Sequence, residues 1–181
     1  MLGRSNSLIL ALAVLAAIVG GIIQHQRQTP AVGQMETSMI GQPLPALVLP
    51  DLQGRPHPLT AYLGRRLLLN FWASWCGPCL QEMPALNQAQ QKFGDHGVIV
   101  LGIAMDEPDR VRAFLATHAV SYPILLGQMD GPSTSLQLGD QREILPFSVL
   151  IDADGRIIAT HAGALSQAQL DDWLAAPAES P

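Results

Sequence analysis

Residues 67–79 read LLLNFWASWCGPC and hold both cysteines of the chain, Cys76 and Cys79. The first six residues form a largely apolar run of strand length, and a helical pattern follows Pro78. Two cysteines separated by two residues, at a change from strand to helix, are typical of a redox pair. A helix beginning here aims unpaired N–H groups and its positive dipole end at Cys76, which favours thiolate over thiol. We therefore expect Cys76 to be the attacking nucleophile and Cys79 the less exposed, resolving thiol.

Two other interpretations of the cysteine pair were weighed. A structural zinc site needs four ligands, and no second cysteine pair is present in the sequence. A purely structural disulfide is also disfavoured, because so short a closed loop constrains the unfolded chain little. The five histidines are scattered without ligand spacing: His25, His57, His96, His118 and His161.

The segment FWASWCGPC (71–79) resembles the active-site segment of the thioredoxin superfamily. The following LQEMP (80–84) narrows the resemblance to the TlpA/ResA/DsbE-like group of membrane-anchored thiol–disulfide oxidoreductases. A second block, LPFSVLIDADGRI (145–157), is similar to the cis-proline strand and hairpin of that group, and PDLQG (50–54) matches upstream. The resemblance implies a thioredoxin-like three-layer α/β/α fold with a mixed central sheet.

The pattern of the chain agrees with that order of elements. Buried strands are expected at residues 67–72, 98–104 and 124–126, with helices at 78–93 and 108–118. A hairpin is expected at 148–160 and a last helix opening with a capping box at 166–169. Prolines confine a short hairpin near residues 46–58 to an edge. Such an order predicts parallel central strands joined by right-handed crossovers.

The N-terminal part predicts a membrane anchor. Residues 8–23 carry no charged side chain and follow Arg4. Their helical length is about 24 Å, close to the ~30 Å hydrocarbon core. We favour an uncleaved signal anchor at 1–24, a flexible tether at 25–39 and the thioredoxin-like domain at 40–181; a cleaved secretory peptide is the alternative. With Arg4 kept inside, the domain lies across the membrane, and the resemblance implies a single-pass inner-membrane protein facing the periplasm.

A carboxylate follows the second cysteine by three residues. Thioredoxins carry a buried Asp in the strand before the motif, where this chain has Asn70, which cannot titrate. The resembled group places a glutamate at the position of Glu82, on the same helix face as Cys79. Glu82 is therefore expected to act as the base that helps Cys79 lose its proton. The alternative is an ordinary solvated carboxylate favoured by the helix dipole.

The resemblance also implies the residues that contact substrate. Pro146 matches the cis-proline that faces the disulfide, although X–Pro bonds are cis in only about 5–6% of cases. The chain departs from the pattern at Phe147, where threonine is frequent in the group. Trp72 is expected in the core and Trp75 at the surface beside Cys76. The predicted substrate-binding residues are Trp75, Gly77, Pro78, Leu145 and Pro146.

These features predict a protein-disulfide reductase that acts on exported proteins and is re-reduced by a membrane thiol–disulfide transporter. The resemblance suggests cytochrome c maturation or the assembly of copper-dependent oxidases as the pathway. The net charge of −5 argues against nucleic acid, and neither a cofactor nor a metal is expected. Two alternatives are a thiol peroxidase, whose Pro-x-x-x-Thr-x-x-Cys setting is missing before Cys76, and a metal-carrying module, whose Met/His ligands are missing.

Overall fold

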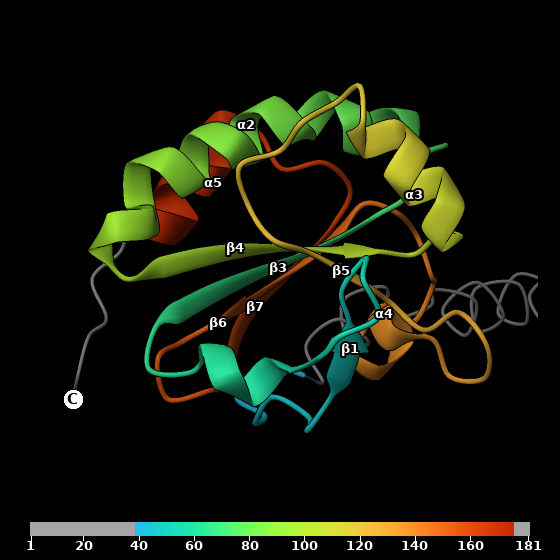
Figure 1. Cartoon of the computed structure of the whole chain (residues 1–181). Coiled ribbons are helices and arrows are strands. Elements are labelled where there is room, and N and C mark those ends of the chain that lie inside the picture. Colours follow the sequence, from blue (N-terminus) through green and yellow to red (C-terminus); the bar gives the residue numbers. More distant parts are fainter. Residues whose placement is uncertain (1–38, 176–181) are drawn as a thin grey trace, which may run out of the picture. The chain divides into compact units, whose positions relative to one another are not determined.

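The structure, a computed structural model, describes residues 39–175, and these residues are built around a five-stranded mixed sheet (Figure 1). The strand order is β5-β4-β3-β6-β7. β3, β4 and β5 are parallel, whereas β6 is antiparallel to β3 and β7 to β6. The strands are β3 (Arg66–Trp72), β4 (Val98–Ala104), β5 (Ile124–Leu126), β6 (Phe147–Ile151) and β7 (Ile157–Ala162). The predicted succession of strands along the chain and the predicted parallel pairing of the central strands are confirmed.

Three helices cover one face of this sheet (Figure 1). They are α2 (Gly77–Phe93), α3 (Pro108–Leu115) and α5 (Gln167–Ala175). Leu68 of β3 packs on this side with Leu86 of α2 and Leu170 of α5. Because side chains alternate along a strand, the neighbours of Leu68 in β3 face the opposite side. β3 is therefore buried on both faces, which explains its nearly unbroken apolar run.

Short elements cover the opposite face. They are β1 (Val48–Pro50), β2 (Pro56–Pro58), the 3-10 helix η2 (Leu59–Tyr62) and α4 (Thr134–Gln137). β1 and β2 pair only with each other, as a small antiparallel sheet. Leu49, Leu59 and Leu138 of this layer join the cluster formed by Leu67 and Phe71. The predicted third layer is thus present, but it consists of short pieces in place of long helices.

The ends of the helices refine the sequence prediction. α2 ends at Phe93 and continues into a 3-10 turn, η3 (Gly94–His96). The left-handed glycine that ends the turn is Gly97, with φ 88°, whereas Gly94 is right-handed. At α5 the predicted capping box is confirmed, because Gln169 N donates to Ser166 Oγ at 3.3 Å and Ser166 N donates to Gln169 Oε1 at 3.0 Å.

The predicted anchor and all of the predicted tether except residue 39 lie outside the described residues. Within residues 39–175, no helix has the length and apolar character that crossing a membrane requires.

Candidate functional site

The two cysteines form a disulfide at the junction of β3 and α2. Cys76 is the N-cap residue of α2, and its Sγ accepts a hydrogen bond from Cys79 N at 3.3 Å. Pro78 lies in the first turn, where its missing N–H leaves no helical bond unmade. The predicted placement of the motif at the start of a helix is therefore confirmed, and the contact to Sγ is the kind that stabilises a thiolate.

The two sulfurs differ in access. Cys79 is fully buried and Cys76 keeps 5% of its surface exposed, so the predicted order of exposure is confirmed. The opening is narrow, because Cys76 packs with Cys79 and Met83 in a third apolar cluster that also contains Trp72. A visiting disulfide can therefore reach only the first sulfur directly.

Exposed residues surround that opening. Trp75 is 66% exposed, and Gly77 and Pro78 are exposed as well. Trp72, in contrast, is fully buried and packs on Phe114 of α3 at 5.4 Å between ring centroids. The predicted division between a core and a surface tryptophan is confirmed.

The peptide bond between Leu145 and Pro146 is cis, as the resemblance implied. Leu145 packs against the apolar cluster that contains the disulfide, and Pro146 is buried at the start of β6. The structure thus brings Leu145, which precedes Pro146, to the apolar cluster around the disulfide from a different sequence block. Substrate contacts at these residues stay a prediction.

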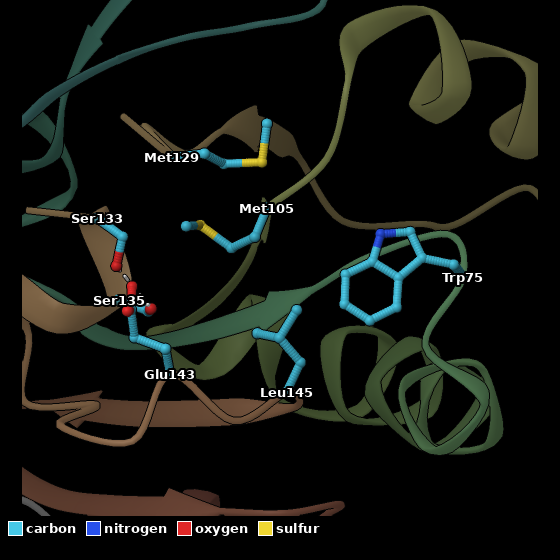
Figure 2. Close-up of a pocket in the computed structure, with 7 residues that line it drawn as sticks. All are labelled: Trp75, Met105, Met129, Ser133, Ser135, Glu143 and Leu145. Carbon is cyan, nitrogen blue, oxygen red and sulfur yellow. Dashed lines mark hydrogen bonds between the residues drawn. The ribbon is translucent and has the colours of Figure 1, made fainter. Parts of the chain in front are cut away.

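A cleft of about 160 Å³ opens beside Trp75 and Leu145 (Figure 2). Figure 2 shows the two side chains on one side of it and the thioethers of Met105 and Met129 on another. Its full lining is Trp75, Met105, Met129, Ser133, Ser135, Glu143 and Leu145. Sequence reasoning missed most of these residues, because they come from four separate segments that carry no motif.

Asp106 anchors the loop that precedes the motif, a role the sequence did not reveal. Its Oδ2 accepts from Ser74 N at 2.9 Å and from the Ser74 hydroxyl. β3 and β4 are parallel neighbours, so residues that follow their carboxyl ends meet at one edge of the sheet. That topology was the available signal, since Asp106 follows β4 as Ser74 follows β3.

Glu82 is buried, with 3% of its surface exposed, so the alternative of a solvated helix carboxylate is wrong. Asn70 Nδ2 donates to its Oε1 at 2.6 Å, and the Leu165 N–H donates to its Oε2 at 2.7 Å. Burial raises the pKa of Glu82 from 4.5 to about 7, against the opposing effect of these two hydrogen bonds. A carboxyl with a pKa near neutrality, three residues after Cys79, suits proton exchange with a thiol.

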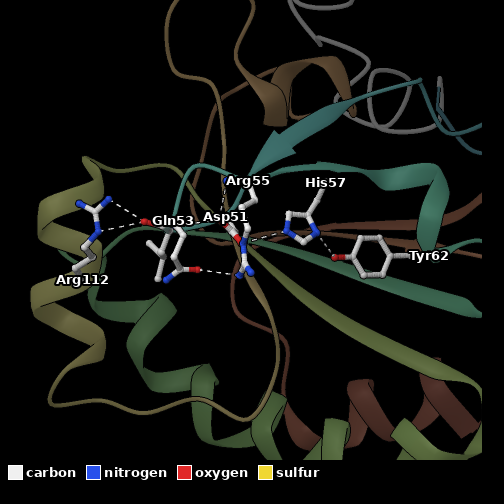
Figure 3. Close-up of polar contacts among 7 residues, drawn as sticks. Asp51, Gln53, Arg55, His57, Tyr62 and Arg112 are labelled. Carbon is white, nitrogen blue, oxygen red and sulfur yellow. Dashed lines mark hydrogen bonds and ion pairs between the residues drawn. The ribbon is translucent and has the colours of Figure 1, made fainter.

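A second polar cluster, away from the disulfide, links the residues of the β1–β2 hairpin by hydrogen bonds (Figure 3). Asp51 accepts hydrogen bonds from Arg55 Nε at 2.7 Å and from His57 Nε2 at 3.2 Å, and the Tyr62 hydroxyl lies 3.4 Å from His57 Nδ1. Desolvation opposes the ionisation of Asp51, but the hydrogen bonds to its carboxylate outweigh it and lower the pKa of Asp51; the largest of these is the bond from the Arg55 backbone N–H at 2.9 Å.

No group of three or more His, Cys, Asp or Glu side chains in the described range is arranged to hold a metal ion.

Comparisons with known proteins agree with this geometry. Residues 40–160 match a family model described as the AhpC/TSA family. A thiol-disulfide oxidoreductase ResA of Geobacillus thermodenitrificans is 32% identical over 136 residues, which are 75% of this chain and 76% of the relative. Another ResA, of Bacillus thuringiensis, is 28% identical over 172 residues and covers 94% and 96% of the two chains.

Among solved structures, a thiol:disulfide interchange protein of the thioredoxin family from Chlorobium tepidum superposes with a TM-score of 0.61. It is 26% identical, and the match covers 74% of this chain and 93% of that one. The predicted thioredoxin-like α/β fold with a mixed central sheet is confirmed.

Proposed function

The chain belongs to the AhpC/TSA family and is a thiol–disulfide oxidoreductase, and we propose that it works as a reductase of disulfides in exported proteins. The observation that carries the proposal is the arrangement at the start of α2. Cys76 caps the helix at a narrow opening, Cys79 lies buried behind it, and the buried Glu82 carboxyl follows one turn later.

In the first step the Cys76 thiolate attacks one sulfur of a substrate disulfide. The substrate S–S bond breaks, a mixed disulfide with Cys76 forms, and the other substrate sulfur leaves as a thiolate. The Cys79 N–H that points at Cys76 Sγ, together with the helix dipole, favours the thiolate needed for this attack.

In the second step Cys79 resolves the mixed disulfide. Its thiol gives a proton to the Glu82 carboxylate, and the resulting thiolate attacks Cys76 Sγ. The mixed disulfide breaks, the second substrate sulfur leaves, and the Cys76–Cys79 disulfide forms. Two electrons have then passed from the protein dithiol to the substrate, which gains two thiols.

The Gly77-Pro78 dipeptide between the cysteines is one determinant of the redox potential, and it supports the proposed direction of transfer. Reducing thioredoxins have potentials near about −270 mV, whereas strongly oxidising relatives lie near about −120 mV. Gly-Pro is the dipeptide that separates the two cysteines in the reducing proteins. A reductase in an oxidising compartment needs a continuing electron source, and we propose a membrane thiol–disulfide transporter for that role.

The N-terminal apolar run at 8–23 and Arg4 before it support the proposed location. We propose a single-pass anchor in the inner membrane, with the catalytic domain in the periplasm. Substrates there are disulfide-containing exported proteins, and the resemblance to ResA- and DsbE-like proteins supports apocytochrome c maturation or copper-oxidase assembly as the pathway.

The test is the midpoint potential of the Cys76–Cys79 pair in the full-length chain, equilibrated with thiol–disulfide buffers. We expect a midpoint potential of about −270 mV. We also expect the protein to reduce a protein disulfide, and the Cys76→Ser variant to lack this activity. A value near about −120 mV would reverse the proposed direction. Trapping mixed disulfides in cells with Cys79→Ser then identifies the substrates.

The same preparation separates the alternatives. Rapid turnover of hydrogen peroxide would revive the thiol peroxidase hypothesis. Tight anaerobic binding of a soft metal by both thiolates, without reduction of disulfides, would support the metal-carrying module.

A further inference from the structure

The Glu82 carboxyl is held by donors from two elements far apart in the sequence. Its Oε2 accepts from the Leu165 N–H just before α5, and its Oε1 accepts from the Asn70 amide of β3 at 2.6 Å. The backbone donor is fixed by the chain, whereas the amide depends on one side chain. Asn70 is fully buried, so solvent does not compete for this hydrogen bond, and removal of the amide deprives Glu82 Oε1 of its donor.

A neighbouring strand holds the amide itself. Asn70 stands opposite Ser148 of β6 in the antiparallel register, and Asn70 Nδ2 donates to Ser148 Oγ at 3.1 Å. Ser148 is also fully buried. The two hydrogens of Nδ2 are therefore directed at the Glu82 carboxyl and at the Ser148 hydroxyl, which fixes the plane of the amide.

On its other side Asn70 pairs in register with Gly102 of β4. A Cβ at Gly102 would lie 3.0 Å from the Tyr122 ring, so the missing side chain makes room for that ring beside Asn70. The Tyr122 hydroxyl and the Asn70 Oδ1 are buried, and neither has a hydrogen-bond partner among the residues that the structure describes. Among the residues that the structure describes, the hydrogen-bond donors directed at the Glu82 carboxyl are the Asn70 amide and the Leu165 N–H.

We propose that Asn70, backed by Ser148, is a positioning residue that orients the Glu82 carboxyl and keeps it ionisable for the resolving step. The inference rests on the proposed role of Glu82 as the base for Cys79. An amide suits this place because it donates a hydrogen bond without adding charge. A second carboxylate here would repel the charge on Glu82.

The titratable groups that face this cluster are few. From the segment before β5, Tyr122 interacts electrostatically with Glu82, and burial followed by that charge raises the pKa of Tyr122. From β7, His161 stands opposite Ser148 in the register. From α2 come Glu82 itself and the two cysteines. The Asn70, Ser148 and Gln90 variants described below keep all of these groups, so their contribution to the pH profile is the same in each of those variants and in the parent.

The resolving step can be timed apart from the attack. The full-length chain is reduced and mixed with one equivalent of dithiobis(nitrobenzoate), an aromatic disulfide. Attack by Cys76 releases one thionitrobenzoate, and resolution by Cys79 releases the second. The rate of each phase is followed against pH.

Asn70→Leu removes the donor and keeps the volume close to that of the amide. We expect it to slow the second phase about tenfold at neutral pH and to move the midpoint of its pH profile up by about one unit, with the first phase unchanged. Ser148→Ala, which frees the amide, is expected to act in the same direction by about threefold.

The matched control is Gln90→Leu. Gln90 Oε1 accepts from Val100 N at 2.8 Å, so this variant also loses an amide contact between α2 and the sheet, but about two turns away from Glu82. Its second phase should match the parent. If Asn70→Leu does not fold, Ser148→Ala decides.

Three results overturn the inference. Unchanged second-phase profiles in Asn70→Leu and Ser148→Ala, while Glu82→Gln alters its own profile, would remove the positioning role and leave the base intact. Equal slowing of both phases would indicate a general structural defect. A Glu82→Gln profile identical to the parent would remove the proposed base, and the inference with it.

Discussion

Glu82→Gln should change how the stability of the oxidised protein depends on pH. The folded protein raises the pKa of this buried carboxyl from 4.5 to about 7, so it binds the proton more tightly than the unfolded chain does. This tighter proton binding stabilises the folded state fully below pH 4.5, and the stabilisation is lost as the pH rises through about 7. At about 1.36 kcal/mol per pKa unit, the loss amounts to about 3 kcal/mol.

The assay is urea denaturation of the oxidised parent and of Glu82→Gln at several values between about pH 4 and about pH 9. Glutamine keeps the shape of the side chain and cannot ionise, and every other titrating group is shared. The free energy of unfolding of the variant, minus that of the parent, should therefore rise by about 3 kcal/mol across this range. A difference that stays constant with pH would show that Glu82 has an ordinary pKa, and the argument for a base near neutrality would fail.

Three further predictions concern the frame of the site. Asp51→Asn should lower Tm most near neutral pH and least in acid. The folded protein lowers the pKa of Asp51, so the stabilisation by its carboxylate is fully present above pH 3.8 and is lost as the pH falls through the pKa of the folded state. An equal loss of Tm at all pH values would contradict this. Asp106→Ala should reduce stability by about 1–3 kcal/mol and slow attack on substrates, since the Ser74 N–H and hydroxyl lose their acceptor; denaturation and the attack rate check both effects. Gly102→Ala should cost about 1–3 kcal/mol because a Cβ would lie 2.5 Å from Ile124 Cδ1, whereas Gly77→Ala, with no atom within 4 Å, should leave the stability of the fold nearly unchanged.

The sequence predicted the parts of the fold that local pattern controls. β4 lies at residues 98–104 as expected, and β3 and α2 begin one residue earlier than expected. β3 and β4 are strongly apolar and α2 is long, with buried residues at helical spacing, so the sequence pattern and the burial agree. α3 ends at Leu115, before the predicted end at 118; beyond it the N–H and the hydroxyl of Thr117 both donate to Phe114 O, a local bonding pattern that departs from the helix.

The sequence predicted those parts of the site that lie within its two recognisable motifs. The cysteine pair, the surface Trp75 and the cis bond before Pro146 lie in the two sequence blocks 71–79 and 145–157, and the structure brings those blocks together. The burial of Glu82 could not be read from its helix alone, because its environment is supplied by Asn70 of β3 and by the backbone of Leu165. The spacing of residues along α2 indicates which way the Glu82 side chain points, but it does not indicate which residues of other elements bury it.

The long-range contacts share a single physical origin. The cleft lined by Met105 and Met129, and the bond from Ser74 to Asp106, join residues that follow different strands. Each depends on strand order and register, which the residue pattern constrains only once the topology is known.

The most direct test of the account is the alkylation rate of each cysteine in the reduced full-length chain at neutral pH, resolved by peptide mass spectrometry. Cys76 caps α2 and keeps the only exposed part of the pair, so we expect it to react at least about tenfold faster than Cys79 and faster than a free model thiol. Equal rates for the two cysteines, or faster labelling of Cys79, would contradict the assignment of Cys76 as the nucleophile.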